Sequence, residues 1–481
     1  MSTEGEIART EAHELHRALG PWQLIALGIG AIIGTGIFVI TGHAAATYAG
    51  PGVVISFMIA GLGCLFAGLC YAEFASMIPV AGSAYTYTYA TMGKFLAWII
   101  GWNLVLEYLA AASTVAVGWS GYFNALLGEF GLHVPDALAS APIAINSGHG
   151  ISGTGSVANF LALGIIALIS ALLVVGIKVA AQFNSAMVAL KLTIVVLVII
   201  FGLPLIHVDN ITPFIPPNTG VWGQFGWSGV LRATGVIFFA YIGFDAVSVA
   251  AQEARNPKRD IPIGILGSLV ICTVLYILMS LTMTGLAPYT SLNVPHPVFV
   301  AIQNAGPELA WLGFLVDVGA VIGLASVVLV LLLGQSRIFY AMAKDGLVPD
   351  LFGRIHPRFR TPWLGTIVTG VFAAALSATV PLDILGELVS IGTLAAFVIV
   401  CVGILVLRVR EPDVKRPFRT PFVWIVAPLG ILMCGAMMYW LPFDTWVRLI
   451  VWTIIGLGIY GFYGARNARP PQWMLRKQPA E

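Results

Sequence analysis

The chain has 481 residues, of which 58% are hydrophobic and 10% are charged, and its formal net charge is +2. Soluble globular domains carry roughly 25% charged residues, so this composition excludes a water-soluble protein. We therefore expect the chain to lie in a lipid bilayer, and we expect no nucleic acid among its partners.

Apolar runs of about 18 or more residues, each long enough to cross a bilayer as a helix, recur along nearly the whole chain. We count about twelve, at residues 22–47, 51–77, 95–126, 157–177, 183–205, 229–251, 262–286, 308–334, 363–381, 386–407, 421–441 and 445–464. Only helices and closed barrels satisfy their backbone groups inside lipid. The pattern therefore predicts an all-α membrane protein with about 12 transmembrane helices.

The placement of the 24 Lys and Arg residues predicts how these spans are oriented. With the N-terminus inside, all lie at one face except Arg232 and Arg448, at the opposite face, and Lys191, within a span. Because positive residues concentrate on the cytoplasmic side, both termini are predicted to be cytoplasmic, in a cell membrane. On that side the connector Pro412–Pro421 is basic, which favours anionic lipid headgroups.

The first apolar run is interrupted by the glycine-rich stretch Gly28–Gly36. Glycine is a poor helix former, and unpaired backbone groups inside a bilayer are costly, so a break there needs a partner such as a polar ligand. The amides of Gly34, Thr35 and Gly36 would begin a second half-helix, whose positive dipole end suits a carboxylate. We take these residues and Ile32 as candidate substrate-binding residues. The alternative is that a G-x-x-x-G pair in this stretch forms a close-packing helix interface.

Two acidic residues follow in the second and third spans. Glu73 ends the second span and is predicted to be structural. Glu107 lies deep in the third span, where a charge costs at least about 2.5–3.5 kcal/mol and therefore usually marks a path for ions or substrate. Glu107 is a candidate to receive a cationic side chain or a proton. The alternative is that it serves as a structural partner for Lys191.

Lys191 lies in the middle of the fifth span, with apolar residues on both sides. Removing an ammonium group from water favours its neutral form, so such a lysine can gain and lose a proton. We predict that Lys191 carries the coupling proton. The alternative is a permanently paired structural lysine.

The second interrupted run contains the stretch Phe239–Asp245. The carbonyl groups of Phe239, Ala240 and Ile242 would face a cavity at the negative end of a half-helix dipole, which prefers an ammonium group. The carboxylate of Asp245 adds a full charge on the same side of the break. The alternatives are that Asp245 is a charge near a helix end and that Phe239 faces lipid instead of covering the site. Together the two breaks predict recognition of a zwitterion.

The two breaks also predict the organisation of the chain. If spans 1–5 and 6–10 are repeats, the odd number of spans inverts the second repeat, and the breaks would meet antiparallel at the bilayer midplane. We predict a cytoplasmic segment at 1–21, repeats at 22–205 and 229–407, two further spans within 421–464 and a tail at 465–481. Asp317, in the eighth span, is either a helix-packing charge or part of an ion path.

These motifs resemble the amino acid–polyamine–organocation superfamily and, within it, the cationic amino acid transporter branch. The resemblance covers nearly the whole chain and is carried, in order, by Gly28–Phe38, Ala72–Tyr89, Phe239–Asp245 with Glu253–Pro257, Gly334–Arg337 and Glu411–Asp413. It implies a five-plus-five inverted-repeat fold (the LeuT-like fold) with discontinuous helices 1 and 6, one central amino-acid site and alternating access. Animal members of the branch carry fourteen spans, so this chain is more similar to a bacterial member.

The resemblance also implies roles for individual residues. Gly34, Thr35 and Gly36 would hold the substrate carboxylate. The carbonyls of the second break would hold the amine, with Phe239 as a gate. Lys191 matches the lysine that stands in for a sodium ion in proton-coupled members, which implies a position between spans 1, 5 and 8. The acidic positions near the site are matched by Glu107 and Asp245.

Taken together, the residues and the resemblance predict a proton-coupled symporter of L-amino acids, small neutral or cationic, and not an enzyme. No cofactor or metal is expected besides the coupling proton, because the five cysteines have no metal-ligand spacing. One alternative is an amino-acid exchanger without proton coupling. Another is a membrane sensor that binds an amino acid without moving it. A lipid or a small membrane protein remains an open possibility as a further partner.

Overall fold

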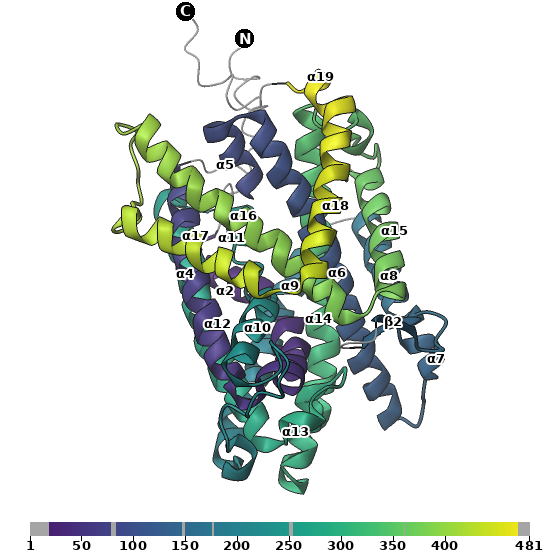
Figure 1. The fold of residues 1–481 in the computed structure, drawn as a ribbon. Coiled ribbons are helices and arrows are strands. Elements are labelled where there is room, and N and C mark those ends of the chain that lie inside the picture. Colours follow the sequence, from purple (N-terminus) through teal and green to yellow (C-terminus); the bar gives the residue numbers. More distant parts are fainter. Residues whose placement is uncertain are drawn as a thin grey trace, which may run out of the picture.

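The computed structural model describes residues 19–77, 83–146, 150–175, 178–249, 254–359 and 361–469. These residues are almost entirely helical, as Figure 1 shows. The longer helices are α2 (Pro21–Ile32), α4 (Val53–Met77), α6 (Lys94–Glu129), α8 (Phe160–Val175), α9 (Lys178–Gly202), α10 (Gly226–Ile237), α12 (Pro257–Leu286), α14 (Ala310–Lys344), α15 (Trp363–Thr379), α16 (Leu382–Arg410), α17 (Val423–Trp440) and α18 (Phe443–Ile459). The prediction of an all-α membrane protein is confirmed.

The predicted spans compare closely with these helices. Eight helical segments among the described residues are long and apolar enough to cross a membrane, fewer than the twelve or so apolar runs of the sequence. The difference has three physical causes. The segment Gly36–Met77 counts once, although it covers the outer part of the first run and the whole second run. The helices α8 and α15 are apolar but short, and the sixth run is divided between α10 and α11 (Ala246–Val249).

Helix packing follows a pattern that recurs between the two halves of the chain. The first-run helix α2 packs along α12 of the seventh run, and correspondingly α10 of the sixth run packs along α4 of the second. Likewise α6 packs against α16, and α14 against α9, which are the third–tenth and eighth–fifth pairs. When each run is replaced by its counterpart five runs away, the pair of runs 1 and 7 becomes the pair 6 and 2. The pair 3 and 10 becomes the pair 8 and 5 in the same way. Two five-span repeats would produce this exchange, and the repeat bounds at 22–205 and 229–407 stay a prediction.

Several short elements lie outside the apolar runs and were not predicted. They are α5 (Ser83–Met92), α7 (Asp136–Ala139), α13 (Pro297–Asn304) and an antiparallel hairpin of β1 (Ile143–Asn146) and β2 (Gly150–Gly153). In Figure 1, α5 lies at the upper end of the bundle, whereas α7, the hairpin and α13 lie toward the other end. Their sequences are too short and mixed for hydrophobic periodicity to reveal them.

A buried ion cluster joins α4 to the connector between α16 and α17. The carboxylate of Glu73 accepts two hydrogen bonds from Arg408, at 3.0 and 2.8 Å, and lies 3.2 Å from Nε of Arg416. The Glu73 side chain is fully buried and also accepts from the Thr420 amide at 2.8 Å. Arg416 in turn donates to the carbonyls of Leu407 and Glu411 at the end of α16 and to those of Pro412 and Val414 in the connector. These contacts agree with the structural role predicted for Glu73.

Candidate functional site

The first predicted break is present in the structure. Helix α2 ends at Ile32, and Ile33 turns out of the helix with φ −72° and ψ 102°. A second half-helix begins with the π-helical turn η1 (Gly36–Ile40) and continues into α3 (Thr41–Ala44) and η2 (Ala45–Ala49). The first N–H groups of a helix lack partners within it, so the amides that open η1 are available to a ligand. Thr35 caps this half-helix, and its buried hydroxyl has no hydrogen-bond partner among the described residues.

The carbonyl end of α2 is capped by side chains from two other helices. Lys191 of α9 is fully buried, and its ammonium group donates to the carbonyl of Gly30 and, at 2.7 Å, to that of Ile33. The hydroxyl of Tyr276 on α12 lies 2.9 Å from the carbonyl oxygen of Ile32. The last carbonyls of a helix are unpaired and form the negative end of its dipole, which a cation stabilises. Lys191 therefore replaces hydrogen bonds that the break removes, and the Tyr276 hydroxyl lies within hydrogen-bond distance of a third carbonyl.

Lys191 lies where it was predicted, between spans 1, 5 and 8. Besides its bonds to the break, its side chain packs on Gly323 of α14, where an added Cβ would lie 3.2 Å from the Cβ of Lys191. The alternative of a pair with Glu107 is wrong, because the nitrogen of Lys191 is taken up by backbone carbonyls and no described carboxylate forms an ion pair with it.

The second predicted break is also present. Helix α10 ends at Ile237, a 3-10 turn η6 (Phe238–Tyr241) follows, and Ile242 is extended before α11 begins. Of the three carbonyls predicted to bind an amine, that of Phe239 accepts from the Ile242 amide at 3.2 Å, and that of Ala240 accepts from Tyr276 at 2.5 Å. A carbonyl oxygen has two lone pairs, so each retains one acceptor site for a ligand. The Phe239 side chain is buried, which excludes the lipid-facing alternative.

The two breaks contact each other directly. A Cβ added to Gly36 would lie 2.4 Å from both Cα and Cβ of Ala240, so only glycine permits this approach. Gly243 has φ +115°, and a Cβ added to it would lie 2.8 Å from the backbone carbonyl of Ala31. Ala31 meets Gly243, and Gly36 meets Ala240, so residue numbers rise along one break and fall along the other. The two segments therefore pass antiparallel, as predicted. The close-packing alternative holds at Gly30 alongside the break, since a Cβ added there would lie 2.4 Å from Val188 of α9, whereas one added to Gly34 would only touch Val327 of α14, at 3.4 Å.

Tyr276 was not identified from the sequence, although it joins the two breaks. Its hydroxyl lies within hydrogen-bond distance of a carbonyl on each, Ile32 and Ala240, and its ring packs edge-on against Tyr241. The side chain is fully buried. The available signal was a single tyrosine in the middle of an apolar run, which resembles ordinary core packing. Nothing local to α12 indicates that it meets residues 36 and 244 positions away.

We expect Tyr276→Phe to lower kcat/KM for uptake about fivefold to tenfold, because it removes a hydrogen bond worth about 1 kcal/mol from the junction of the breaks. Tyr122→Phe is the matched control. The Tyr122 hydroxyl also donates to a carbonyl of the first run, that of Phe38 at 2.7 Å, but beyond the break. Equal uptake by the two variants would contradict a special role for Tyr276.

Two buried carboxylates lie on the α6 side of the second break. Asp245 accepts a hydrogen bond from the Tyr108 hydroxyl at 3.3 Å. Glu107, which precedes Tyr108 on α6, interacts electrostatically with Asp245. Thr393 of α16 lies beside Glu107, and its hydroxyl donates to the carbonyl of Val389 at 3.0 Å. Both side chains are less than 5% exposed. The structure thus brings these predicted residues together on one side of the second break, apart from Lys191.

Asp317 is separate from this group. It lies fully buried on α14, and neither carboxylate oxygen has a hydrogen-bond partner within the part of the chain that the structure describes. An isolated buried charge is costly, which disfavours a simple packing role.

Comparison with known proteins establishes the family. Residues 19–460 match the model of the amino acid permease family. The chain belongs to the amino acid permease family. It is 46% identical over 470 residues to a branched-chain amino acid permease of Bacillus subtilis (strain 168), with 97% of each chain covered. It is 44% identical over 461 residues to a methylthioribose transporter of the same organism, with 96% of each chain covered.

Eukaryotic relatives are similar over a smaller share of their length. The chain is 38% identical over 401 residues to the vacuolar cationic amino acid transporter 4 of Arabidopsis thaliana, covering 83% of this chain and 65% of that protein. The resemblance to the amino acid–polyamine–organocation superfamily and its cationic amino acid transporter branch is thereby confirmed. Membership makes this permease a multi-pass membrane protein of an amino-acid transport family.

Proposed function

We propose that this permease is a secondary active transporter that moves L-amino acids together with protons by alternating access, in a cell membrane with both termini cytoplasmic. The observation that carries the proposal is the direct contact of two broken helices, with Lys191 donating to the carbonyl end of one of them. Broken helices that meet inside a transporter provide backbone groups of both polarities to a substrate. An amino acid, with one carboxylate and one ammonium, matches that pair.

The substrate carboxylate is assigned to the first break. The amides of Gly34, Thr35 and Gly36 open a half-helix at its positive dipole end. The unpartnered hydroxyl of Thr35 adds a donor beside them. Ile32 ends the preceding half-helix and shares Tyr276 with the opposite break.

The substrate amine is assigned to the second break. The carbonyls of Phe239, Ala240 and Ile242 provide acceptors there, and Phe239 covers the site as a gate. Two buried carboxylates, Glu107 and Asp245, lie beyond them. Because the ammonium of Lys191 is engaged with the first break, it does not neutralise these carboxylates. This arrangement supports cationic as well as small neutral substrates, with a proton on one carboxylate when the substrate carries no side-chain charge.

Proton coupling is assigned to Lys191. When protonated, its ammonium group holds the carbonyls of Gly30 and Ile33 and so fixes the end of α2. A neutral amine is a weaker donor and has no attraction to the negative end of the dipole, so deprotonation releases α2. One pH unit across the membrane is worth about 1.4 kcal/mol per proton, enough for tenfold accumulation. No other cofactor is required.

The proposal is tested by uptake of labelled alanine, leucine and arginine into proteoliposomes, with and without an inward proton gradient. We expect accumulation above the external concentration, abolished by a protonophore. Methylthioribose belongs in the competition panel because a close relative is named for it. Uptake that needs preloaded amino acid and ignores the gradient would make the protein an exchanger. Saturable binding without entry into the lumen would make it a sensor.

A further inference from the structure

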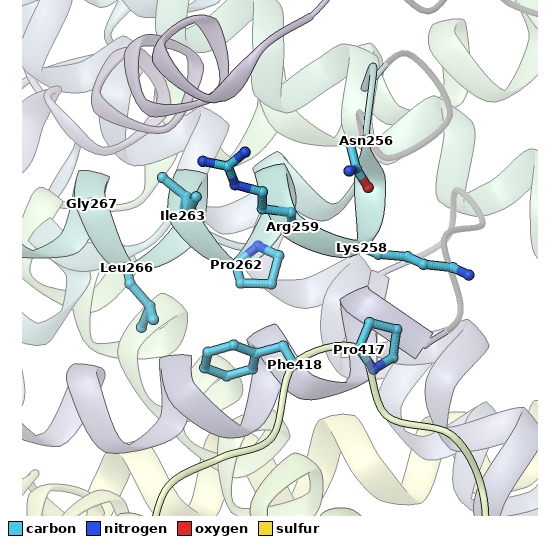
Figure 2. Close-up of a pocket in the computed structure, with 9 residues that line it drawn as sticks. All are labelled: Asn256, Lys258, Arg259, Pro262, Ile263, Leu266, Gly267, Pro417 and Phe418. Carbon is cyan, nitrogen blue, oxygen red and sulfur yellow. The ribbon is translucent and has the colours of Figure 1, made fainter.

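A cavity of about 660 Å³ lies between the beginning of α12 and the connector that follows α16. Figure 2 shows that Pro262 and Leu266 of α12 lie opposite Pro417 and Phe418 of the connector. The volume falls in the range of ligand sites, roughly 300–1,000 Å³. The cavity is therefore large enough for part of an amphiphile.

The lining is polar at one end and apolar at the other. Asn256, Lys258 and Arg259 form the polar end, at the first turn of α12. The apolar end is formed by residues further along the helix and in the connector: Pro262, Ile263, Leu266, Gly267, Pro417 and Phe418. At 1.5 Å per residue, the α12 lining extends roughly 16 Å along the helix, about the depth of one hydrocarbon leaflet.

The polar end carries positive charge that no described residue neutralises through an ion pair. Lys258 and Arg259 are both exposed, and neither takes part in an ion pair with a described residue. The nearest carboxylate in sequence, Asp260, is buried and accepts a hydrogen bond from the Asn256 amide. Among the described residues that line the cavity, none is acidic. Two cations at a membrane surface attract an anionic headgroup.

The apolar end opens toward the lipid-facing side of α12. Ile263 is exposed, and the exposed Val270 and Val274 continue the same face of the helix at spacings of seven and four residues. Just beyond the connector, Phe422 and Trp424 are also exposed, as aromatic residues at a membrane surface commonly are. An acyl chain in the cavity would therefore be continuous with the surrounding bilayer.

We propose that this cavity binds one anionic phospholipid, with its headgroup at the polar end near Lys258 and Arg259, whose side chains extend from α12 in different directions (Figure 2), and an acyl chain along Leu266 and Phe418. The connector that forms the opposite wall is held by Glu73 through Arg416 and Thr420. The bound lipid links this fixed wall to α12. The site does not depend on the assignment of the transported substrate or of proton coupling.

The test is native mass spectrometry of the full chain, released from bilayers of mixed phosphatidylglycerol and phosphatidylcholine. We expect the wild type to retain one phosphatidylglycerol. Lys258→Gln/Arg259→Gln should retain it at least about tenfold less, since each cation contributes to headgroup binding. Lys94→Gln/Arg354→Gln removes two exposed charges from the face predicted to be cytoplasmic but outside the cavity, and should behave as the wild type.

A second variant separates the headgroup from the chain. Leu266→Trp fills the apolar end but keeps both cations, and it should also lose the bound lipid. Equal retention by the wild type and both cavity variants would overturn the proposal. So would thermal protection of the wild type by soluble glycerol phosphate as large as that by phosphatidylglycerol, because an anion site without a lipid chain would then explain the cations.

Discussion

Replacing Gly36 by alanine should cut amino-acid uptake to roughly a tenth of the wild-type rate or less. The added Cβ would lie 2.4 Å from the backbone Cα of Ala240, a contact that requires one break to move away from the other. Overpacking of this kind costs about 1–3 kcal/mol, and 1.4 kcal/mol already corresponds to a tenfold change in rate. The measurement is the initial rate of labelled amino-acid uptake into proteoliposomes, normalised to folded protein.

Gly164→Ala provides the matched control. Gly164 lies within α8, and a Cβ added there meets no atom within 4 Å. Alanine is a better helix former than glycine, so this variant should transport as the wild type does and be equally or more stable. If Gly36→Ala kept full activity, the close approach of the two breaks would not be required for transport.

The second large effect concerns stability. Glu73→Gln should destabilise the protein by about 3–5 kcal/mol, because removing one member of a buried ion pair leaves its partners uncompensated. Arg416 is 1% exposed and Arg408 17% exposed, so both guanidinium groups would remain largely desolvated without a carboxylate between them. The measurement is thermal and denaturant unfolding of the purified protein in one detergent.

Asp350→Asn is the control for a lost carboxylate. Asp350 lies 3.9 Å from Arg469, and both side chains are about two-thirds exposed. Exposed pairs of this kind contribute at most about 1 kcal/mol. We expect its melting temperature to match the wild type, well above that of Glu73→Gln. Indistinguishable melting of the two variants would contradict a structural role for the Glu73 cluster.

The features predicted from the sequence are those that local chemistry determines. Glycines in the middle of an apolar run conflict with a continuous helix in lipid, so both breaks could be located. Lys191 could be identified as a candidate because a charged residue inside an apolar span is rare. Its position between spans 1, 5 and 8 followed from the resemblance and agrees with the contacts to Ile33 and Gly323.

The features that were missed depend on contacts between distant parts of the chain. Tyr276 looks like a core residue until its hydroxyl is placed between Ile32 and Ala240. The Glu73 carboxylate meets Arg408, 335 residues later, and no pattern near either residue reveals the pairing. The α5 and α13 helices lie at the ends of the bundle, where packing on other helices, not an apolar run of their own, selects the helical state.

Proton-driven accumulation by wild type and Lys191→Met in the same proteoliposomes tests the central claim most directly. Methionine has a similar length but no proton to exchange and no donor for the carbonyls of α2. The account predicts that the wild type concentrates amino acid in response to an inward proton gradient, and that Lys191→Met exchanges amino acids across the membrane without responding to the gradient. Gradient-driven accumulation by Lys191→Met at the wild-type level would contradict the assignment of proton coupling to Lys191.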